Sequence, residues 1–333
     1  MHIEKIFLDE IYRCYSTMAM ELDGDLHYFF ASEEKGYPCY AYPAHNIHQR
    51  KTVWEKGGGT MSMIPLPQSK NQFIAIMDFY LKECPSQAKL VHVTYENGSF
   101  IQKDLFYLPF LHRFDLYEVL GKVWFIGATI AHDKKDKEDW SQPGKIYVGE
   151  LNLMGETKLR VIKEGLTRNH GYTQSPLKDG GYFGCDEGLY KVSIPTQNSD
   201  WKVEQVLKGQ IGEVALCDVN QDGQFEIMTI EPFHGNQIKI YASKEVVFNY
   251  PGNFDFAHTL VGASIHGVPS FIGGIRRETP DLFMVQYEAG SYQTILVDKG
   301  VGPANLNVVQ YLDKSIIHSA NHTQNEAAIY IVE

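Results

Sequence analysis

The sequence predicts an all-β protein, and within that class a seven-bladed β-propeller with four strands in each blade. Three observations lead to this prediction. Apolar residues at helical spacing are nearly absent, whereas short runs rich in Val, Ile, Phe and Tyr recur between Gly, Asn, Asp and Pro turns. One type of strand recurs seven times along the 333 residues. Its period of roughly 40 to 60 residues is typical of a propeller blade rather than of a solenoid or sandwich.

The recurring strand combines apolar positions with a central Tyr or Lys, and we assign it the third position of each blade. Its copies lie at residues 37–41, 89–93, 145–148, 188–192, 238–241, 282–285 and 328–331. A strand rich in small residues precedes each copy and suits the crowded middle of a blade. These second strands lie at residues 28–32, 73–77, 123–129, 181–184, 225–230, 270–274 and 315–320.

Six copies are followed by a fourth strand, and the N-terminal segment is predicted to supply the seventh. The six lie at residues 51–55, 102–107, 159–163, 203–207, 246–250 and 293–298. Residues 3–8 are apolar and alternating in the same way. We therefore expect this N-terminal strand to complete the last blade and close the ring, which removes exposed sheet edges. Residues 1–333 then form a single propeller domain.

Composition narrows the classes of partner. The net charge of −11 argues against nucleic acid and anionic membranes as partners, since both would repel the chain. No apolar run approaches a membrane span of roughly 18 residues and the N-terminus does not resemble a signal peptide, so we expect a cytoplasmic protein. The five cysteines lack a CxxC pair and are predicted to be reduced and buried: Cys14, Cys39, Cys84, Cys185 and Cys217.

One face of the predicted propeller gathers histidines. Loops that enter the inner strands share a face with loops that join second and third strands. Six of the thirteen histidines fall there: His112, His132, His170, His234, His258 and His322. Repeated placement at equivalent points of separate blades predicts a functional site at the mouth of the central channel.

Neutral imidazole and carboxylate groups from neighbouring blades are suitable ligands for a divalent metal, zinc or manganese. The predicted ligands are His170, Glu213, His234 and His258. The alternative is that these groups bind substrate hydroxyls or ordered water. No closely spaced motif such as HExxH decides between the two.

The same face supplies candidate catalytic and substrate-binding residues. His112, His170 and Arg113 are the predicted catalytic residues, with one histidine moving a proton. Tyr80 and Tyr172 are expected to stack on a sugar. The full set predicted to bind substrate is Asp78, Tyr80, Tyr172, Arg276, Arg277, Asn305 and His322. Arginine holds carboxylates and oxyanions bidentately, although surface solubility is the alternative reading of the paired arginines.

An acidic loop begins at Asp218 and has oxygen ligands at alternate positions, as in the first half of a calcium loop. It is not an EF-hand, because Thr229 occupies loop position twelve and the flanks are strands. Calcium binding by Asp218, Asn220 and Asp222 is one interpretation. The other is a tight hairpin in which these side chains bond their own backbone.

Residues 218–241, with the segment DVNQDGQFEIMTIEPFHGNQIKIY, resemble a blade of an FG-GAP or VCBS-type propeller. Together with residues 253–274 and 300–308 they are similar to the propeller domain of the aldos-2-ulose dehydratase family. The resemblance implies dehydration of a keto-sugar and isomerisation of the product, and it matches His234 and His258 to motif histidines. Family members with that activity carry further domains that these 333 residues do not include.

Two functions remain open from the sequence. The first is a metal-assisted lyase, a dehydratase, or an isomerase acting on a small keto-sugar or related carbohydrate. The second is a non-catalytic propeller that binds carbohydrate or protein, since the fold is compatible with both. A Ser-His-Asp hydrolase is less favoured because no GxSxG motif occurs. The oligomeric state cannot be predicted.

Overall fold

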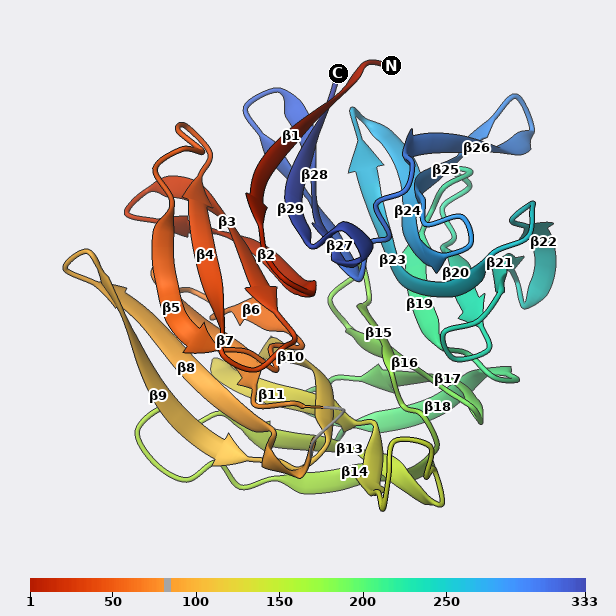
Figure 1. The fold of residues 1–333 in the computed structure, drawn as a ribbon. Coiled ribbons are helices and arrows are strands. Elements are labelled where there is room, and N and C mark those ends of the chain that lie inside the picture. The colour runs from red at the N-terminus through yellow and green to blue at the C-terminus, as the bar shows by residue number, and fades with distance from the viewer. Residues whose placement is uncertain (81–84) are drawn as a thin grey trace.

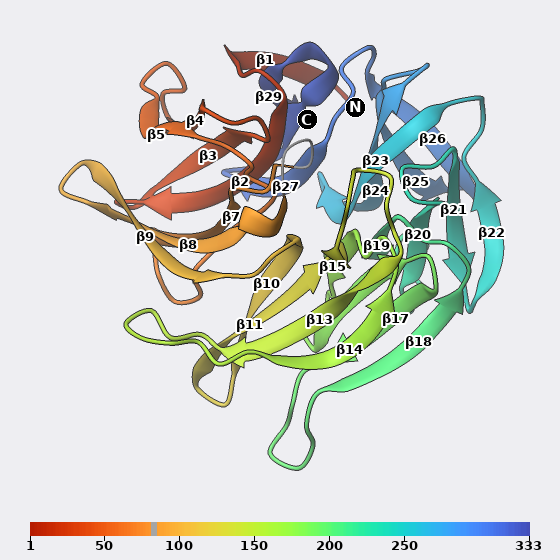
Figure 2. The same cartoon turned by 60° about the horizontal axis from the view of Figure 1, so that its bottom comes forward.

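The protein is an all-β ring of seven blades, as the sequence predicts. The computed structural model describes residues 1–80 and 85–333, so Cys84 lies outside the described residues. Each blade is built on four antiparallel strands, one blade has a short additional strand, and only the last blade takes a strand from the other end of the chain. Figure 2 shows the blades around a centre, with inner strands such as β10, β15 and β23 nearest to it.

The first four blades follow the chain from the second strand onward. Blade 1 contains β2 (Cys14–Leu22), β3 (Asp25–Ser32), β4 (Tyr37–Pro43) and β5 (Lys51–Gly57). Blade 2 contains β6 (Met63–Pro65), β7 (Gln72–Met77), β8 (Lys89–Glu96) and β9 (Ser99–Tyr107). Blade 3 contains β10 (Leu111–Val119), β11 (Lys122–Thr129), β13 (Gln142–Glu150) and β14 (Arg160–Leu166). Blade 4 contains β15 (Gly171–Gln174), β16 (Gly180–Cys185), β17 (Gly188–Ser193) and β18 (Lys202–Lys208).

The last three blades complete the ring. Blade 5 contains β19 (Glu213–Cys217), β20 (Glu226–Glu231), β21 (Gln237–Ala242) and β22 (Glu245–Asn249). Blade 6 contains β23 (Asp255–Ile265), β24 (Val268–Arg277), β25 (Leu282–Glu288) and β26 (Ser291–Asp298). Blade 7 contains β27 (Asn305–Tyr311), β28 (Lys314–Asn321), β29 (Glu326–Val332) and the N-terminal strand β1 (Ile3–Glu10).

The ring closes through β1, which pairs antiparallel with β29 from Ile3 opposite Val332 to Glu10 opposite Glu326. The pairing extends to the chain ends, where the backbones of His2 and Glu333 exchange two hydrogen bonds of 2.8 and 3.0 Å. Both termini therefore lie together beside blade 7 (Figure 1). This closure confirms the predicted role of the N-terminal strand.

The hydrophobic core is divided among the blade junctions. Seven clusters of buried side chains occur in the described residues, and each joins two neighbouring blades; the cluster between blades 2 and 3 also contains Tyr15 and Ala304. The small residues of the second strands leave room for large neighbours: a Cβ on Gly273 would lie 2.3 Å from the ring of Phe283 on the adjacent strand. Blades thus pack face against face, which holds the inner strands at fixed positions around the axis.

Three short elements were not predicted from the sequence. They are β12 (Ala131–Asp133), which pairs with β13, and two 3-10 helices, η1 (Pro85–Gln87) and η2 (His322–Gln324). Within the described ranges, no helix has the length and apolar character needed to cross a membrane. The four described cysteines are free and buried, as expected.

The buried His318 gives a first testable prediction, on pH. Its Nδ1 lies 2.8 Å from the Thr17 hydroxyl, and burial lowers its pKa to about 3 from an ordinary 6.5. Between these values the unfolded chain binds the proton and the folded protein does not, so stability is lost as the pH falls through this window. Urea unfolding at about pH 7, 6 and 5 gives the free energy of unfolding as a function of pH. In His318→Gln this free energy should fall less steeply with decreasing pH than in the wild type, by up to about 1.4 kcal/mol per pH unit. Equal slopes would show that His318 does not titrate in this way.

Candidate functional site

Three inner strands have the same irregularity near their N-terminal ends, and each irregularity carries a side chain of the site. The ladder between first and second strands shifts register between Cys14 and Ser16, between Leu111 and Arg113, and between Ala257 and Thr259. The extra residues are Tyr15, His112 and His258, from blades 1, 3 and 6. A β-bulge redirects its side chain and is common beside active sites. Here the bulges bring these three buried side chains together in the channel.

Two further histidines come from loops. His170 immediately precedes β15, and His234 lies in the turn between β20 and β21. Gly171 allows β15 to approach β19, because a Cβ there would lie 2.9 Å from the Cα of Glu213. His234 has a left-handed backbone with φ of 48°. Non-glycine residues in this conformation cost free energy and are enriched at functional sites.

The imidazoles of His170, His234 and His258 form a cluster, which we call the three-histidine site. One ring nitrogen from each lies within 4.8 Å of the others. The Nε2 atoms of His170 and His234 are 3.4 Å apart. His170 and His258 are each only 2% exposed. Within the described part of the chain, this is the group of ligand-type side chains with the spacing to hold a metal.

Backbone carbonyls fix the tautomer of two of these histidines. Nδ1 of His170 lies 3.0 Å from the carbonyl oxygen of Gly212, and Nδ1 of His258 lies 2.6 Å from that of Ala304. A carbonyl oxygen can only accept, so both Nδ1 atoms carry the proton in the neutral ring. Both Nε2 atoms are left with a lone pair. Metal-binding histidines are commonly oriented in this way.

The electrostatics of the site keep its imidazoles neutral. Burial lowers the pKa of His170 to about 3, with a further lowering by the cation of Arg113. Burial also holds the pKa values of His112, His234 and His258 well below their ordinary range. Tyr15 responds in the opposite sense, because burial raises its pKa to about 12. At neutral pH the site therefore offers imidazole lone pairs beside a protonated phenol.

Tyr15 links His112 to the three-histidine site. Its hydroxyl lies 3.4 Å from Nε2 of His112 and 3.5 Å from Nε2 of His258. The His112 ring also packs on the His170 ring, with centroids 4.5 Å apart. Nδ1 of His112 has no hydrogen-bond partner among the described residues.

Glu213 lies beside the cluster and is paired with a cation. Its Oε2 accepts a hydrogen bond of 3.2 Å from Arg113, and its Oε1 accepts one of 2.9 Å from the Tyr172 backbone N–H. Burial raises the pKa of Glu213 to about 7 although Arg113 opposes this shift. Arg113 also donates to the carbonyl oxygen of His170 and to Oδ1 of Asn305. The structure thus places Glu213 and Arg113 as a buried pair that supports the histidine loops, with Glu213 outside the three-histidine site.

A cavity of about 550 Å³ opens above the site. Four histidines and Tyr15 lie in its lining, and aromatic side chains form much of the remaining wall: Phe79, Tyr80, Trp140, Phe233 and Phe256. Charged side chains at the lining include Arg276, Arg277 and Glu33. The volume and mixed lining suit a small polar molecule.

The other predicted substrate-binding residues have different placements. Tyr80 lines the cavity, whereas Asp78 accepts a hydrogen bond from its hydroxyl and pairs with Lys89. Asn305 donates to the carbonyl oxygen of Tyr15 at 2.7 Å. His322 contacts both Arg276 and Glu33. Asp78, Asn305 and His322 thus position the wall residues.

Tyr172 is placed away from the cavity lining, in contrast to the stacking role expected for it. Its hydroxyl donates to Asp115 at 2.6 Å and lies 2.7 Å from the Tyr117 hydroxyl. The direction of β15 carries this residue further along the channel than His170. Tyr172 therefore belongs to a separate buried polar group.

The acidic loop has the hydrogen bonds of the hairpin interpretation. The carboxylate of Asp218 accepts from the backbone N–H groups of Asp222 and Gly223, and Asn220 and Asp222 accept from Asp222 and Gln224. Gly223 has the positive φ of 88° that this turn requires. The side-chain oxygens proposed as calcium ligands thus accept hydrogen bonds from backbone N–H groups of the same loop.

Sequence analysis missed Tyr15, Glu33 and, apart from Tyr80, the aromatic wall as site residues. Tyr15 is the bulged residue near the start of its inner strand, as His112 and His258 are in β10 and β23. Alignment of the inner strands with each other would have detected this equivalence. Whether the aromatic side chains line the cavity depends on the geometry of their loops, and no comparable pattern in the sequence indicates it.

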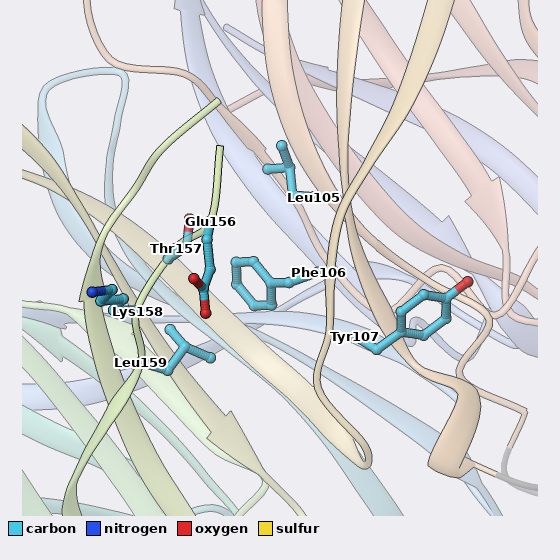
Figure 3. Close-up of a pocket in the computed structure, with 7 residues that line it drawn as sticks. All are labelled: Leu105, Phe106, Tyr107, Glu156, Thr157, Lys158 and Leu159. Atoms are coloured by element: carbon cyan, nitrogen blue, oxygen red, sulfur yellow. The ribbon is translucent and has the colours of Figure 1, made fainter. Parts of the chain in front are cut away.

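A second hollow lies at the periphery between β9 and the loop that precedes β14. In Figure 3 the ring of Phe106 points towards Thr157 and Glu156, while Tyr107 points the other way. Its lining contains no histidine or cysteine. It is a groove between the outer parts of blades 2 and 3, and none of the predicted site residues lines it.

Comparisons with known proteins support the fold. No family model matches the chain, and no curated protein matches it. Among solved structures, the Dos1 propeller has a TM-score of 0.57 at 6% identity, over 92% of this chain and 75% of that one. A luciferin-regenerating enzyme has a TM-score of 0.51 at 10% identity, over 99% of this chain and 94% of that one. At these identities the likenesses show the propeller fold alone.

Proposed function

We propose that the protein is a metal-dependent lyase or isomerase that acts on a small keto-sugar in the channel cavity. The observation that carries the proposal is the three-histidine site, where two of three converging imidazoles have their Nε2 lone pairs fixed by backbone carbonyls. Three neutral histidines with an open fourth position are a common ligand set for catalytic zinc, whereas manganese, the other metal predicted from the sequence, prefers oxygen ligands. When bound, such a cation would polarise a substrate carbonyl.

Tyr15 and His112 supply the acid and base that loss of water from a keto-sugar needs. Neutral His112 can accept the proton α to the carbonyl at Nε2, and the electrons of that C–H bond form the new C=C bond. The C–O bond to the β-hydroxyl breaks, and the Tyr15 hydroxyl gives this oxygen its proton, so that water leaves. The 3.4 Å separation of the two side chains then allows the proton to return from His112 to Tyr15.

The proposed function predicts a large effect of removing one hydroxyl. In zinc- or manganese-loaded protein, Tyr15→Phe should lower kcat for keto-sugar dehydration by about 100-fold, the usual contribution of one acid–base group. The assay follows the ultraviolet absorbance of the unsaturated ketone formed from D-fructose or 2-keto-D-gluconate. Tyr117→Phe is the matched control, because it removes a buried hydroxyl outside the cavity and should change kcat little. Ligand binding without metal-dependent turnover would instead assign the cavity to a non-catalytic carbohydrate-binding propeller.

A further inference from the structure

Arg276 is a cation in the cavity wall that forms no ion pair with a carboxylate of the described residues. Its Nη2 lies 2.7 Å from Nδ1 and 3.1 Å from Nε2 of His322, and Nε2 of His322 lies 2.9 Å from Oε1 of Glu33. Arginine only donates and an ionised carboxylate only accepts, so His322 accepts from Arg276 at Nδ1 and donates to Glu33 at Nε2. His322 is then neutral. The positive charge of Arg276 is thus anchored by a neutral side chain, while the charge of Glu33 acts on it without a direct ion pair.

Arg276 also retains a buried donor that no described residue satisfies. Its Nε has no hydrogen-bond partner among the described residues. Its guanidinium lies 4.9 Å from the centroid of the Phe256 ring, which supports it as a flat platform. Burial lowers the pKa of Arg276, which reflects the cost of holding this cation away from bulk water.

The cavity lining has a net positive charge, whereas the whole chain has a net negative charge. The described lining contains five cations and three carboxylates, although the protein has a net charge of −11. Each lining carboxylate already pairs with a lining cation, through Arg13 for Glu33 and Glu34 and through Lys137 for Glu138. Arg168 and Arg277 pair with aspartates outside the lining. Arg276 is thus the lining cation without a carboxylate partner in the described part of the chain.

We infer that Arg276 holds an anionic group, a carboxylate or a phosphate, on a sugar-like ligand that occupies the same cavity as the three-histidine site. This inference rests on the proposed function, since it narrows the substrate to a sugar acid or sugar phosphate. A guanidinium fork matches both groups, and its hydrogen bonds to an anion are stronger than those to a neutral hydroxyl.

The test is calorimetric titration of zinc-loaded protein with three related ligands: neutral D-fructose, 2-keto-D-gluconate and D-fructose 6-phosphate. At least one anion should bind about tenfold or more tightly than fructose, and the tighter of the two identifies the group. Arg276→Gln should abolish this preference. Arg160→Gln is the matched control, because it removes the same charge from an exposed arginine outside the cavity lining and should retain the preference. Arg276→Lys should retain only part of it, since the charge remains and the fork is lost.

Several outcomes would overturn the inference. They are equal affinity for fructose and both anions, no binding of either anion, and a preference that survives in Arg276→Gln. If circular dichroism shows that Arg276→Gln is unfolded, the comparison is made with Arg276→Lys, and an unchanged preference overturns it. Failure of the proposed function can be distinguished from failure of this inference. Anion binding through Arg276 without turnover refutes only the enzyme, whereas metal-dependent turnover of fructose without anion binding refutes only this inference.

Discussion

Zinc is expected to bind the wild-type protein with one ion per chain, and to bind His258→Gln at least about 100-fold more weakly. His258 contributes one of the three converging nitrogens, and its Nε2 lone pair is fixed by the 2.6 Å contact between Nδ1 and Ala304. Gln retains a polar side chain of moderate size but lacks the imidazole donor. Two neutral nitrogens remain, and they hold a divalent ion less tightly than three.

The affinity is measured by competition with a chromophoric chelator at neutral pH, where the imidazoles are unprotonated. His132→Gln is the matched control, because His132 lies exposed on the same face and outside the three-histidine site. Its affinity for zinc should match that of the wild type. Equal zinc affinity in His258→Gln and wild type would remove His258 from the ligand set.

Replacing Glu213 by Gln is expected to destabilise the folded protein by about 3–5 kcal/mol, which is typical when one partner of a buried ion pair is removed. The cause is the cation left behind, since Arg113 is only 8% exposed and would lose its carboxylate partner. The net contribution of the Arg113–Glu213 ion pair to the stability of the folded protein is smaller than this 3–5 kcal/mol, which is about the cost of leaving Arg113 unpaired. Burial raises the pKa of Glu213 to about 7 in spite of Arg113, so the carboxylate is costly to hold in its charged form.

Urea unfolding at about pH 8, where Glu213 is ionised, measures this effect. Glu164→Gln is the control, because it breaks the 3.3 Å contact with Lys145 at an exposed carboxylate and should cost about 0.5 kcal/mol or less. A double variant, Arg113→Gln with Glu213→Gln, should be less destabilised than either single one, because no charge is then buried alone. A loss below about 1 kcal/mol in Glu213→Gln would contradict this account of the pair.

The blade pattern could be predicted because each blade repeats one local sequence pattern, and the closing strand could be predicted because residues 3–8 share it. The face that carries the histidines followed from the same repeat. The depth at which each side chain lies in the channel could not be predicted from this repeat. Tyr172 follows His170 by two residues, yet its hydroxyl bonds Asp115 instead of lining the cavity.

Bulges and pairings across the channel are the features that sequence reasoning could not reach. Whether Tyr15 points to the axis depends on one extra residue in the ladder opposite Ala31, which no local pattern of β2 reveals. Glu213 was predicted to bind metal because carboxylates do so in general. Its partner Arg113 lies 100 positions earlier in the chain, and only the closed ring brings the two together.

The central claim is that the three-histidine site holds a divalent metal, and anomalous diffraction from crystals of the zinc-loaded protein tests it most directly. The account predicts one strong peak at the zinc absorption edge, bounded by the imidazole nitrogens of His170, His234 and His258, and its loss in His258→Gln crystals. A wild-type map without a peak there, or with zinc only at the acidic loop around Asp218, would contradict it.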